Sequence, residues 1–251
     1  MIKVEDLHKT FAENYVLRGV NLEIRDGETI TIIGGSGCGK TVLLKHIVGL
    51  LKPDKGKIYI NSTEITSLTE HELGEYQKKF GYLFQGSALF DSLTAGENVA
   101  FGLHNMNFNE KLIKKKVSDC LGHVGLSGAE DIKPAELSGG MKKRVALARA
   151  IAYDPEYICY DEPTTGLDPI MADAINELII HLQKTLKVTS IVVTHDLSSA
   201  YKISNRIAML YDGKIITLGS PEEIKKTSNE YVKQFITGSI NGPIKLKLKE
   251  F

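Results

Sequence analysis

The segment from Gly34 to Thr41, Gly-Gly-Ser-Gly-Cys-Gly-Lys-Thr, places several glycines directly before a lysine and a threonine. Glycine allows backbone angles and close approaches that a Cβ atom would block. The N–H groups of such a loop can form a concave nest for an anion, and the lysine adds a positive charge beside it. We therefore predict that this loop binds the phosphates of a nucleoside triphosphate. The alternative is a tight glycine-rich turn that Lys-Thr follows by chance.

The residues on either side predict a strand that enters this loop and a helix that leaves it. Thr29 to Ile33 is typical of a buried strand, and apolar residues then recur at helical spacing at Leu43, Leu44, Ile47 and Val48. A helix N-terminus offers free N–H groups and a favourable dipole to a phosphate. In this context the spacing Gly34-x4-Gly39-Lys40-Thr41 meets the P-loop pattern, which kinases, GTPases and motor ATPases share.

Two acidic residues stand at the end of a second predicted strand. Tyr157 to Tyr160 is apolar, and Asp161 and Glu162 follow it directly. Asp161 suits coordination of Mg²⁺ beside Thr41. Glu162 suits orientation or deprotonation of a water that attacks the γ-phosphate. The alternative is that both acids only solvate the end of the strand.

A histidine follows a third apolar strand, Ser190 to Val193, within Thr194-His195-Asp196. His195 can donate a hydrogen bond to a γ-phosphate oxygen and so sense whether that phosphate is present. A histidine in this place is also commonly structural.

A second predicted phosphate site lies far downstream, in Leu137-Ser138-Gly139-Gly140-Met141. Ser138 is a favourable N-cap for a helix from Lys142 to Tyr153, and the Ser-Gly-Gly step exposes N–H groups and a hydroxyl there. Two phosphate sites so far apart in one chain suggest that the second one contacts the nucleotide of another subunit.

Composition excludes several classes of protein. The 251 residues are 42% hydrophobic, and 31 basic residues balance 31 acidic ones, so no overall positive charge would attract nucleic acid. Cys38, Cys120 and Cys159 lack Cys-x-x-Cys spacing, which argues against disulfides or zinc and for a reducing cytosol. The sequence lacks a signal-peptide pattern and any apolar run of the roughly 18 residues that span a bilayer, so we expect a soluble protein.

The remaining sequence predicts an α/β core that a helical insertion interrupts. From about residue 69 to residue 152 the pattern is helical and more charged, with a basic surface helix at 111–122. Helices are also predicted at 172–187 and 221–236. Further strands are predicted at 2–5, 20–24, 57–60 and 82–84, and a hairpin about Asp212-Gly213 joins 207–211 to 214–218.

Taken together, these motifs resemble the ATP-binding cassette (ABC) family over residues 1–238. Phe11 stands where that family stacks an aromatic ring on adenine, with Tyr15 as the alternative. Met141 departs from the pattern, since the family usually has glutamine there, but Ser138 and the two glycines after it are intact. The other matches are Gly34–Thr41 for Walker A, Gln85 for the Q-loop, Leu137–Met141 for the signature, Asp161-Glu162 for Walker B, Gly166-Leu167-Asp168 for the D-loop and His195 for the switch histidine.

The resemblance implies a P-loop ABC cassette with a RecA-like core, an N-terminal antiparallel β subdomain and an α-helical subdomain inserted at about residues 86–153. It implies a head-to-tail homodimer around two ATP molecules with Mg²⁺. The implied catalytic residues are Glu162 as general base, His195, Gln85 and Lys40, and the implied metal ligands are Thr41, Gln85 and Asp161. The implied ATP contacts are Phe11, Gly34, Gly35, Ser36, Gly37, Cys38, Gly39, Lys40, Thr41 and Val42, and Ser138, Gly139, Gly140 and Asp168 across the dimer.

Within the family, segments such as Leu83 to Thr94 and the C-terminal tail resemble the ATPases of Mla-type systems, which move phospholipids between bacterial membranes. This implies a peripheral subunit at the cytoplasmic face of the inner membrane. Its partners would be an integral permease, an MCE-domain protein and accessory cytoplasmic subunits. The alternatives are the ATPase of a polar amino-acid importer and a nucleic-acid-handling ABC ATPase. Neutral charge and the lack of heptads argue against the last, so no nucleic-acid partner is expected.

Two segments admit two interpretations each. Leu89 and Phe90 either pack within the helical insertion or stay exposed to receive a permease helix. In the tail, residues 239–251, Asn241-Gly242-Pro243 breaks the helix, and residues 244–249 alternate apolar and basic before Phe251. The tail is either disordered or docked on the partner ATPase subunit or an accessory protein, since burying each of its large apolar side chains would contribute about 1.5 kcal/mol.

Overall fold

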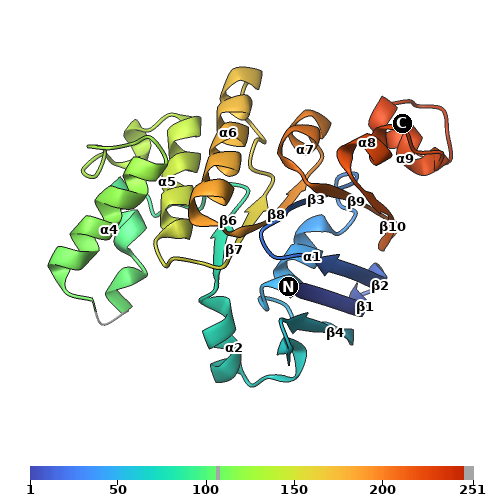
Figure 1. The fold of residues 1–251 in the computed structure, drawn as a ribbon, viewed down its shortest axis with the longest axis horizontal. Coiled ribbons are helices and arrows are strands. Elements are labelled where there is room, and N and C mark those ends of the chain that lie inside the picture. Colours follow the sequence, from blue (N-terminus) through green and yellow to red (C-terminus); the bar gives the residue numbers. More distant parts are fainter. Residues whose placement is uncertain (106–107, 246–251) are drawn as a thin grey trace.

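The computed structural model describes residues 1–105 and 108–245 and has the α/β architecture that the sequence predicts (Figure 1). Its strands are β1 Ile2–Phe11, β2 Asn14–Ile24, β3 Thr29–Ile33, β4 Lys55–Ile60, β5 Thr63–Glu64, β6 Phe80–Leu83, β7 Tyr157–Asp161, β8 Thr189–Thr194, β9 Arg206–Tyr211 and β10 Lys214–Gly219. Among the described residues they form a six-stranded sheet of order β10-β9-β3-β8-β7-β6 and a four-stranded sheet of order β2-β1-β4-β5.

The centre of the six-stranded sheet confirms the strands predicted from continuous apolar runs. Every residue of β3, β7 and β8 is buried, and these strands run parallel to one another, with β9 and β6 parallel at their sides. Parallel strands are covered on both faces, which is why they need such runs. Their carboxyl ends meet at one edge of the sheet, so the segments that follow β3, β7 and β8 converge there.

The four-stranded sheet is antiparallel and longer than the sequence predicts. β1 and β2 pair over their whole length, from Ile2 opposite Ile24 to Phe11 opposite Asn14. The hairpin between β9 and β10 is confirmed. Its two turn residues, Asp212 and Gly213, have φ angles of 46° and 72°, as a two-residue turn with both central residues left-handed requires.

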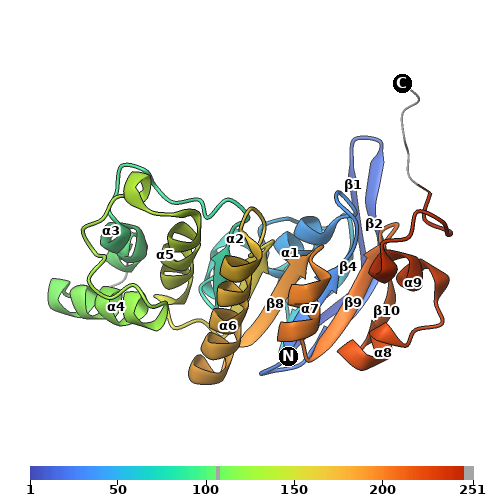
Figure 2. The same ribbon diagram turned by 90° about the horizontal axis from the view of Figure 1, so that it is seen from above.

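The helices divide into one group that covers the central sheet and one that stands apart. The α-helices of the described chain are α1 Lys40–Ile47, α2 Glu70–Gln77, α3 Ala95–Ala100, α4 Glu110–His123, α5 Gly139–Ile151, α6 Pro169–Leu186, α7 Leu197–Ile203, α8 Pro221–Lys225 and α9 Glu230–Thr237. α1 packs on the face of the central sheet that meets the antiparallel sheet, and α6 packs on the opposite face. α3, α4 and α5 lie together at one end of the molecule, inserted between β6 and β7 (Figures 1 and 2).

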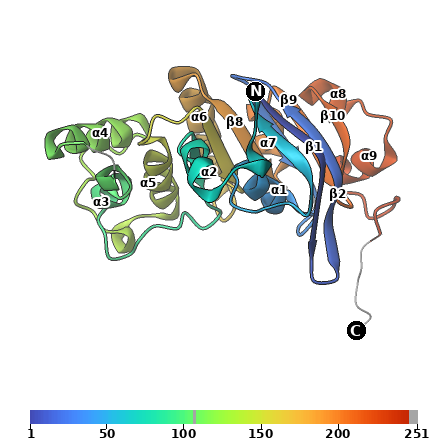
Figure 3. The same ribbon diagram turned by 90° about the horizontal axis from the view of Figure 1, so that it is seen from below.

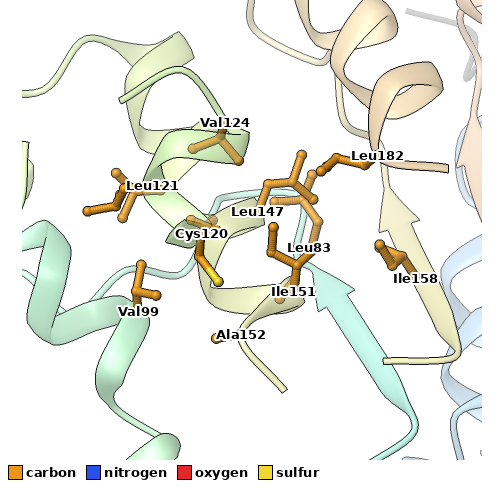
Figure 4. Packing of buried hydrophobic residues seen from close by; sticks show 14 of the residues in the cluster. Leu83, Val99, Cys120, Leu121, Val124, Leu147, Ile151, Ala152, Ile158 and Leu182 are labelled. Atoms are coloured by element: carbon orange, nitrogen blue, oxygen red, sulfur yellow. The ribbon is translucent and has the colours of Figure 1, made fainter. Parts of the chain in front are cut away.

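The α3–α5 group has an apolar interior that continues into the central sheet. Figure 4 shows Val99 of α3, Leu121 of α4 and Leu147 of α5 facing a shared core. The same cluster includes Leu83 of β6 and Ile158 of β7. The α3–α5 group and this edge of the central sheet therefore share one continuous core.

The single helix predicted at 221–236 is wrong, because two helices, α8 and α9, occupy that range. Asn229 is the N-cap of the second helix, and its side chain accepts hydrogen bonds from the N–H groups of Tyr231 and Val232. Asn229 can be recognised in the sequence as a possible N-cap. The helical spacing of apolar residues continues across it, however, and so predicts one helix instead of two. α9 ends at Gly238, whose φ of 64° suits a glycine at a helix C-terminus.

After Gly238 the chain folds back on α9. The buried side chain of Gln234 donates to the carbonyl groups of Ser239 and Ile244 and accepts from the N–H of Ile244 at 2.6 Å. Ile244 also packs against the apolar cluster beneath α8 and α9. In Figure 3 this segment lies next to α9. Most of the alternating segment predicted at 244–249, and Phe251, lie outside the described residues.

Candidate active site

The glycine-rich loop lines a hollow of about 250 Å³ at the carboxyl edge of the central sheet. The loop joins the end of β3 to the start of α1, as the sequence predicts. Residues from β2, the loop, α1, the segment after β6 and the end of β7 meet around it. They are Val16, Ser36, Gly37, Gly39, Lys40, Thr41, Val42, Gln85 and Glu162.

The glycines of the loop have two different physical roles. A Cβ on Gly34 would lie 2.4 Å from the carbonyl oxygen of Leu210, so close packing requires glycine there. Gly35 and Gly37 face open space, which leaves a cradle for a ligand. Gly39, at a φ of 104°, is the N-cap of α1 and has no side chain that could accept a hydrogen bond from the first turn. The N–H groups of that turn are therefore directed at the hollow and suit a phosphate.

Lys40 is buried, with 6% of its surface exposed, and its ammonium group is held at the floor of the hollow. Nζ donates hydrogen bonds to the carbonyl groups of Gly34 at 2.9 Å and Gly35 at 3.1 Å. It also lies 3.4 Å from Oε1 of Glu162. This single cation thus joins the loop to the end of β7.

Thr41 and Asp161 place two oxygen atoms together beside Lys40. Oγ1 of Thr41 donates to Oδ1 of Asp161 at 2.8 Å, and the hydroxyl of Tyr82 donates to Oδ2 at 3.3 Å. Burial raises the pKa of Asp161, although these two hydrogen bonds oppose the shift. A hydroxyl and a carboxylate next to a phosphate cradle match the oxygen ligands that Mg²⁺ takes from proteins, so the residues fit this ion.

Glu162 is the most heavily constrained residue of the hollow. Its φ of 50° is left-handed, which is unfavourable for a residue with a side chain. His195 Nδ1 lies 2.9 Å from Oε2, and the hydroxyl groups of Thr165 and Thr194 each donate to the same oxygen at 3.2 Å. Burial opposes ionisation of Glu162, but the hydrogen bond from His195 and the charge of Lys40 outweigh it, so its pKa lies below the usual value.

The structure brings Gln85 and Glu162 to the glycine-rich loop, but Ser138, Gly139, Gly140 and Asp168 lie apart from this hollow. Ser138 and Gly139 are exposed at the N-terminus of α5, where the Ser138 hydroxyl accepts a hydrogen bond from the N–H of Met141. Gly140 is buried, and a Cβ on it would lie 2.3 Å from Cε of Met171. Asp168 is the N-cap of α6 and accepts hydrogen bonds from two backbone N–H groups there. None of these four described residues lines the hollow at Lys40.

Phe11 also lies outside the hollow. It is 43% exposed at the end of β1, where the ammonium of Lys9 stands over its ring. Tyr15 is 41% exposed, and its hydroxyl is bonded to His8. Val16, in the next position, lines the hollow instead. A cation stands over each ring, Lys9 over Phe11 and Arg18 over Tyr15, and Tyr15 also has the hydrogen bond to His8.

Several residues of the site are absent from the sequence-based prediction. Tyr82 binds Asp161, and Thr165 and Thr194 bind Glu162. Thr194 directly precedes His195, which is a local signal that points to the same strand end. Tyr82 carries no comparable signal, because only the pairing of β6 with β7 sets it opposite Cys159, two residues from Asp161.

The site combines an open phosphate cradle, a carboxylate that suits Mg²⁺ (Asp161) and a second carboxylate that is ionised (Glu162). This combination defines the protein as a P-loop nucleoside triphosphatase. The family model described as "ABC transporter" matches residues 17–165. The chain belongs to the ABC transporter family, and it is the ATP-hydrolysing, nucleotide-binding component of that family.

The chain is similar over most of its length to the following three proteins. The chloroplastic protein TRIGALACTOSYLDIACYLGLYCEROL 3 of Arabidopsis thaliana is 42% identical, over 98% of this chain and 76% of that one. The intermembrane phospholipid transport system ATP-binding protein MlaF of Haemophilus influenzae is 40% identical, over 98% of this chain and 94% of that one. A solved dimeric ATP-binding cassette in a post-hydrolysis state, bound to ADP and Pi, superposes with a TM-score of 0.80 at 35% identity, over 88% and 99% of the two chains.

Proposed function

We propose that this chain is the ATPase subunit of a membrane transporter that carries phospholipid between membranes. The observation that supports this cargo best is the near full-length similarity to a phospholipid transport ATPase, which extends over 94% of that relative. No helix of the described residues is long and apolar enough to cross a membrane. The transport path would therefore belong to an integral permease, with this chain bound to its cytoplasmic side.

In this proposal the hollow at Lys40 holds the β- and γ-phosphates of ATP. The N–H groups of the loop and of the first turn of α1 bind phosphate oxygens, and Lys40 exchanges its present carbonyl partners for them. Thr41 and Asp161, with Gln85, would hold Mg²⁺, which neutralises charge on the phosphate oxygens when it is bound. Phe11 stacks on the adenine ring.

Glu162 acts as the general base, and its present partners explain how it changes state. Without ATP, His195 and Lys40 favour its ionised form. When phosphate oxygens take over those two partners, and bring negative charge close to the carboxylate, the pKa of Glu162 rises. A base whose pKa rises toward neutrality accepts the proton of the attacking water more readily. His195 then donates to the γ-phosphate, and Gln85 orients the water.

Ser138, Gly139 and Gly140 would act on the ATP of a second copy of the chain. The exposed hydroxyl and N–H groups at the start of α5 lie outside the hollow of their own chain, so a second subunit has to bring a phosphate to them. Asp168 bridges the two subunits near the same interface. Two ATP molecules then join the homodimer, and their hydrolysis releases it.

The segment after Gln85 is a proposed docking surface for the permease, and its two apolar residues differ. Leu89 packs against the core of the α3–α5 group, whereas Phe90 is 42% exposed. The ring of Phe90 packs at a tilt against that of Phe101, which is 50% exposed, with ring centroids 4.4 Å apart. Two adjoining exposed aromatic rings suit a helix from a membrane partner. Phe90 is five residues from Gln85. A permease helix that docks on Phe90 would therefore contact the same segment that contributes Gln85 to the ATP site.

We expect Phe90→Glu to reduce permease recovery with the tagged ATPase by about tenfold or more, because it places a charge in an apolar contact. ATP binding should be unchanged, since the hollow is untouched. Leu112→Glu is the matched control, because Leu112 is comparably exposed on α4.

Cargo is tested with the wild-type complex in liposomes, supplied with either a fluorescent phospholipid or a radiolabelled polar amino acid. ATP-dependent movement of the amino acid alone would contradict the phospholipid assignment.

The C-terminal tail is proposed to dock on the partner ATPase subunit or an accessory protein. Gln234 and Ile244 hold residues 239–245 on α9. A truncation after Lys245 therefore removes the terminal segment without exposing the apolar cluster beneath α8 and α9. The truncated protein should bind ATP normally but form less dimer or less complex, as measured by analytical ultracentrifugation and co-purification. Gln234→Ala in the full-length chain should weaken assembly in the same direction. Undiminished assembly of the truncated chain would leave the disordered tail as the correct interpretation.

A further inference from the structure

Lys143 of α5 is a buried cation that the proposed mechanism does not use. It lies on the helix that begins at Ser138, Gly139 and Gly140, three to five residues beyond them, and only 6% of its surface is exposed. Its ammonium donates to the main-chain carbonyl of Gln85 at 3.4 Å and to that of Glu162 at 3.5 Å. One side chain therefore joins three parts of the site: the start of α5, the segment after β6 and the end of β7.

A lysine is unfavourable at this position if packing is its only role. Burial penalises an ammonium group unless strong partners compensate, and burial lowers the pKa of Lys143 although the charge of Glu162 opposes this. A methionine of similar length could fill the same space without a desolvation penalty, and such replacements of buried ions are often neutral or stabilising. The lysine is thus better explained by the two carbonyl groups that it holds.

Those carbonyl groups belong to backbone that needs external support. Glu162 has a left-handed backbone. Its N–H donates to the carbonyl of Val193 at 2.9 Å, and its own carbonyl accepts from the N–H of Thr165 at 3.3 Å and from Lys143 at 3.5 Å. Ser87 and Ala88, just after Gln85, are also left-handed, with φ angles of 63° and 47°. Their carbonyl groups accept hydrogen bonds from Arg149, a second cation of α5, at 2.9 and 2.8 Å. Strained backbone persists only where its surroundings fix it, and here α5 provides that fixation.

We infer that Lys143 is a positioning residue, which ties the helix that carries Ser138 to the main chain of Gln85 and Glu162. Its ammonium sets where the water-orienting and base residues stand relative to α5. When α5 moves against the nucleotide of a second subunit, Lys143 carries that movement to the base. This inference rests on the roles proposed above for Gln85 and Glu162.

The test is ATP turnover by Lys143→Met and Lys143→Arg in the full-length chain. A misplacement of about 1 Å at a reacting group can cost about 100-fold in rate, so Lys143→Met should lower kcat by about 10- to 100-fold. KM for ATP should change little, because the hollow keeps its phosphate-binding groups. Lys143→Arg retains the charge and can reach both carbonyl groups, so it should recover much of the loss. Lys115→Met, at an exposed site on α4, is the control for the same chemical change.

Two further readouts separate positioning from a merely structural role. The thermal midpoint of Lys143→Met should change little, since the loss of hydrogen bonds to two carbonyl groups and the removal of a buried charge oppose each other. Combining Lys143→Met with Gln85→Ala should lower kcat by less than the product of the single effects, because Lys143 acts partly through Gln85. If Lys143→Met keeps kcat within about twofold of wild type, the inference is wrong. Should Lys143→Met fail to fold, a folded Lys143→Arg variant whose kcat lies about 100-fold or more below wild type would overturn the inference.

Glu162→Gln assayed in parallel distinguishes this inference from the function on which it rests. Loss of turnover in Glu162→Gln with normal turnover in Lys143→Met would refute only the positioning role. Normal turnover in Glu162→Gln would instead refute the proposed base, and with it the path by which Lys143 acts.

Discussion

In the Glu162→Gln variant, ATP turnover is expected to fall by about 10²- to 10⁴-fold while ATP binding is retained. The substitution keeps the shape of the side chain but removes the carboxylate that accepts a proton from the attacking water. Lys40, Thr41 and the N–H groups of the loop remain to bind the phosphates. Since hydrolysis is what opens the proposed dimer, the variant should accumulate as an ATP-bound dimer.

Phosphate release, binding of a fluorescent ATP analogue and light scattering measure these three quantities separately. Glu156→Gln is the matched control, because Glu156 is exposed and forms only a surface ion pair with Lys79. It should retain wild-type turnover. A Glu162→Gln protein that hydrolyses ATP at the wild-type rate would show that another group is the base. Loss of binding together with turnover would show that Glu162 is needed to form the hollow itself.

The second large effect is expected on mixing two inactive variants. Lys40→Ala should weaken ATP binding by about 10- to 100-fold, since a charged hydrogen bond contributes about 1.5–3 kcal/mol. Ser138→Arg should block the second subunit from closing on a bound ATP. In a mixed head-to-tail dimer, one composite site carries both lesions and the other carries neither. Turnover should therefore return on mixing, whereas each variant alone stays inactive.

Crosslinking tests the same arrangement without relying on activity. Ser138→Cys in one tagged chain and Ser36→Cys in a second, untagged chain should be joined by a short bismaleimide in the presence of ATP and the Glu162→Gln background. Ser118→Cys, on an exposed face of α4, should give no ATP-dependent crosslink to Ser36→Cys. Absence of a crosslink between the tagged and untagged chains, or a crosslink that ignores ATP, would refute the head-to-tail arrangement. Failure of mixing with normal crosslinks would mean that one intact site is insufficient for turnover.

The sequence by itself determined those parts of the protein whose chemistry is local. The strand, the glycine turn and the helix start are contiguous from residue 29 to residue 48, so one segment specifies a phosphate cradle. Asp161-Glu162 and His195 each follow a continuous apolar run, and parallel strands of that kind meet at one edge. The α/β class, the central strands and the hairpin at Asp212-Gly213 follow from the same local rules.

The tertiary structure alone decided which side chains meet across the chain. Lys143 is 58 residues from Gln85 and 19 from Glu162, and nothing in its local sequence distinguishes it from Lys142. Leu89 and Phe90 are neighbours of similar character, yet only packing of the α3–α5 group covers part of the first and leaves the second exposed. Periodicity shows which face of an element is apolar, but not which element covers it. A buried polar group acquires its role only when packing supplies its partner.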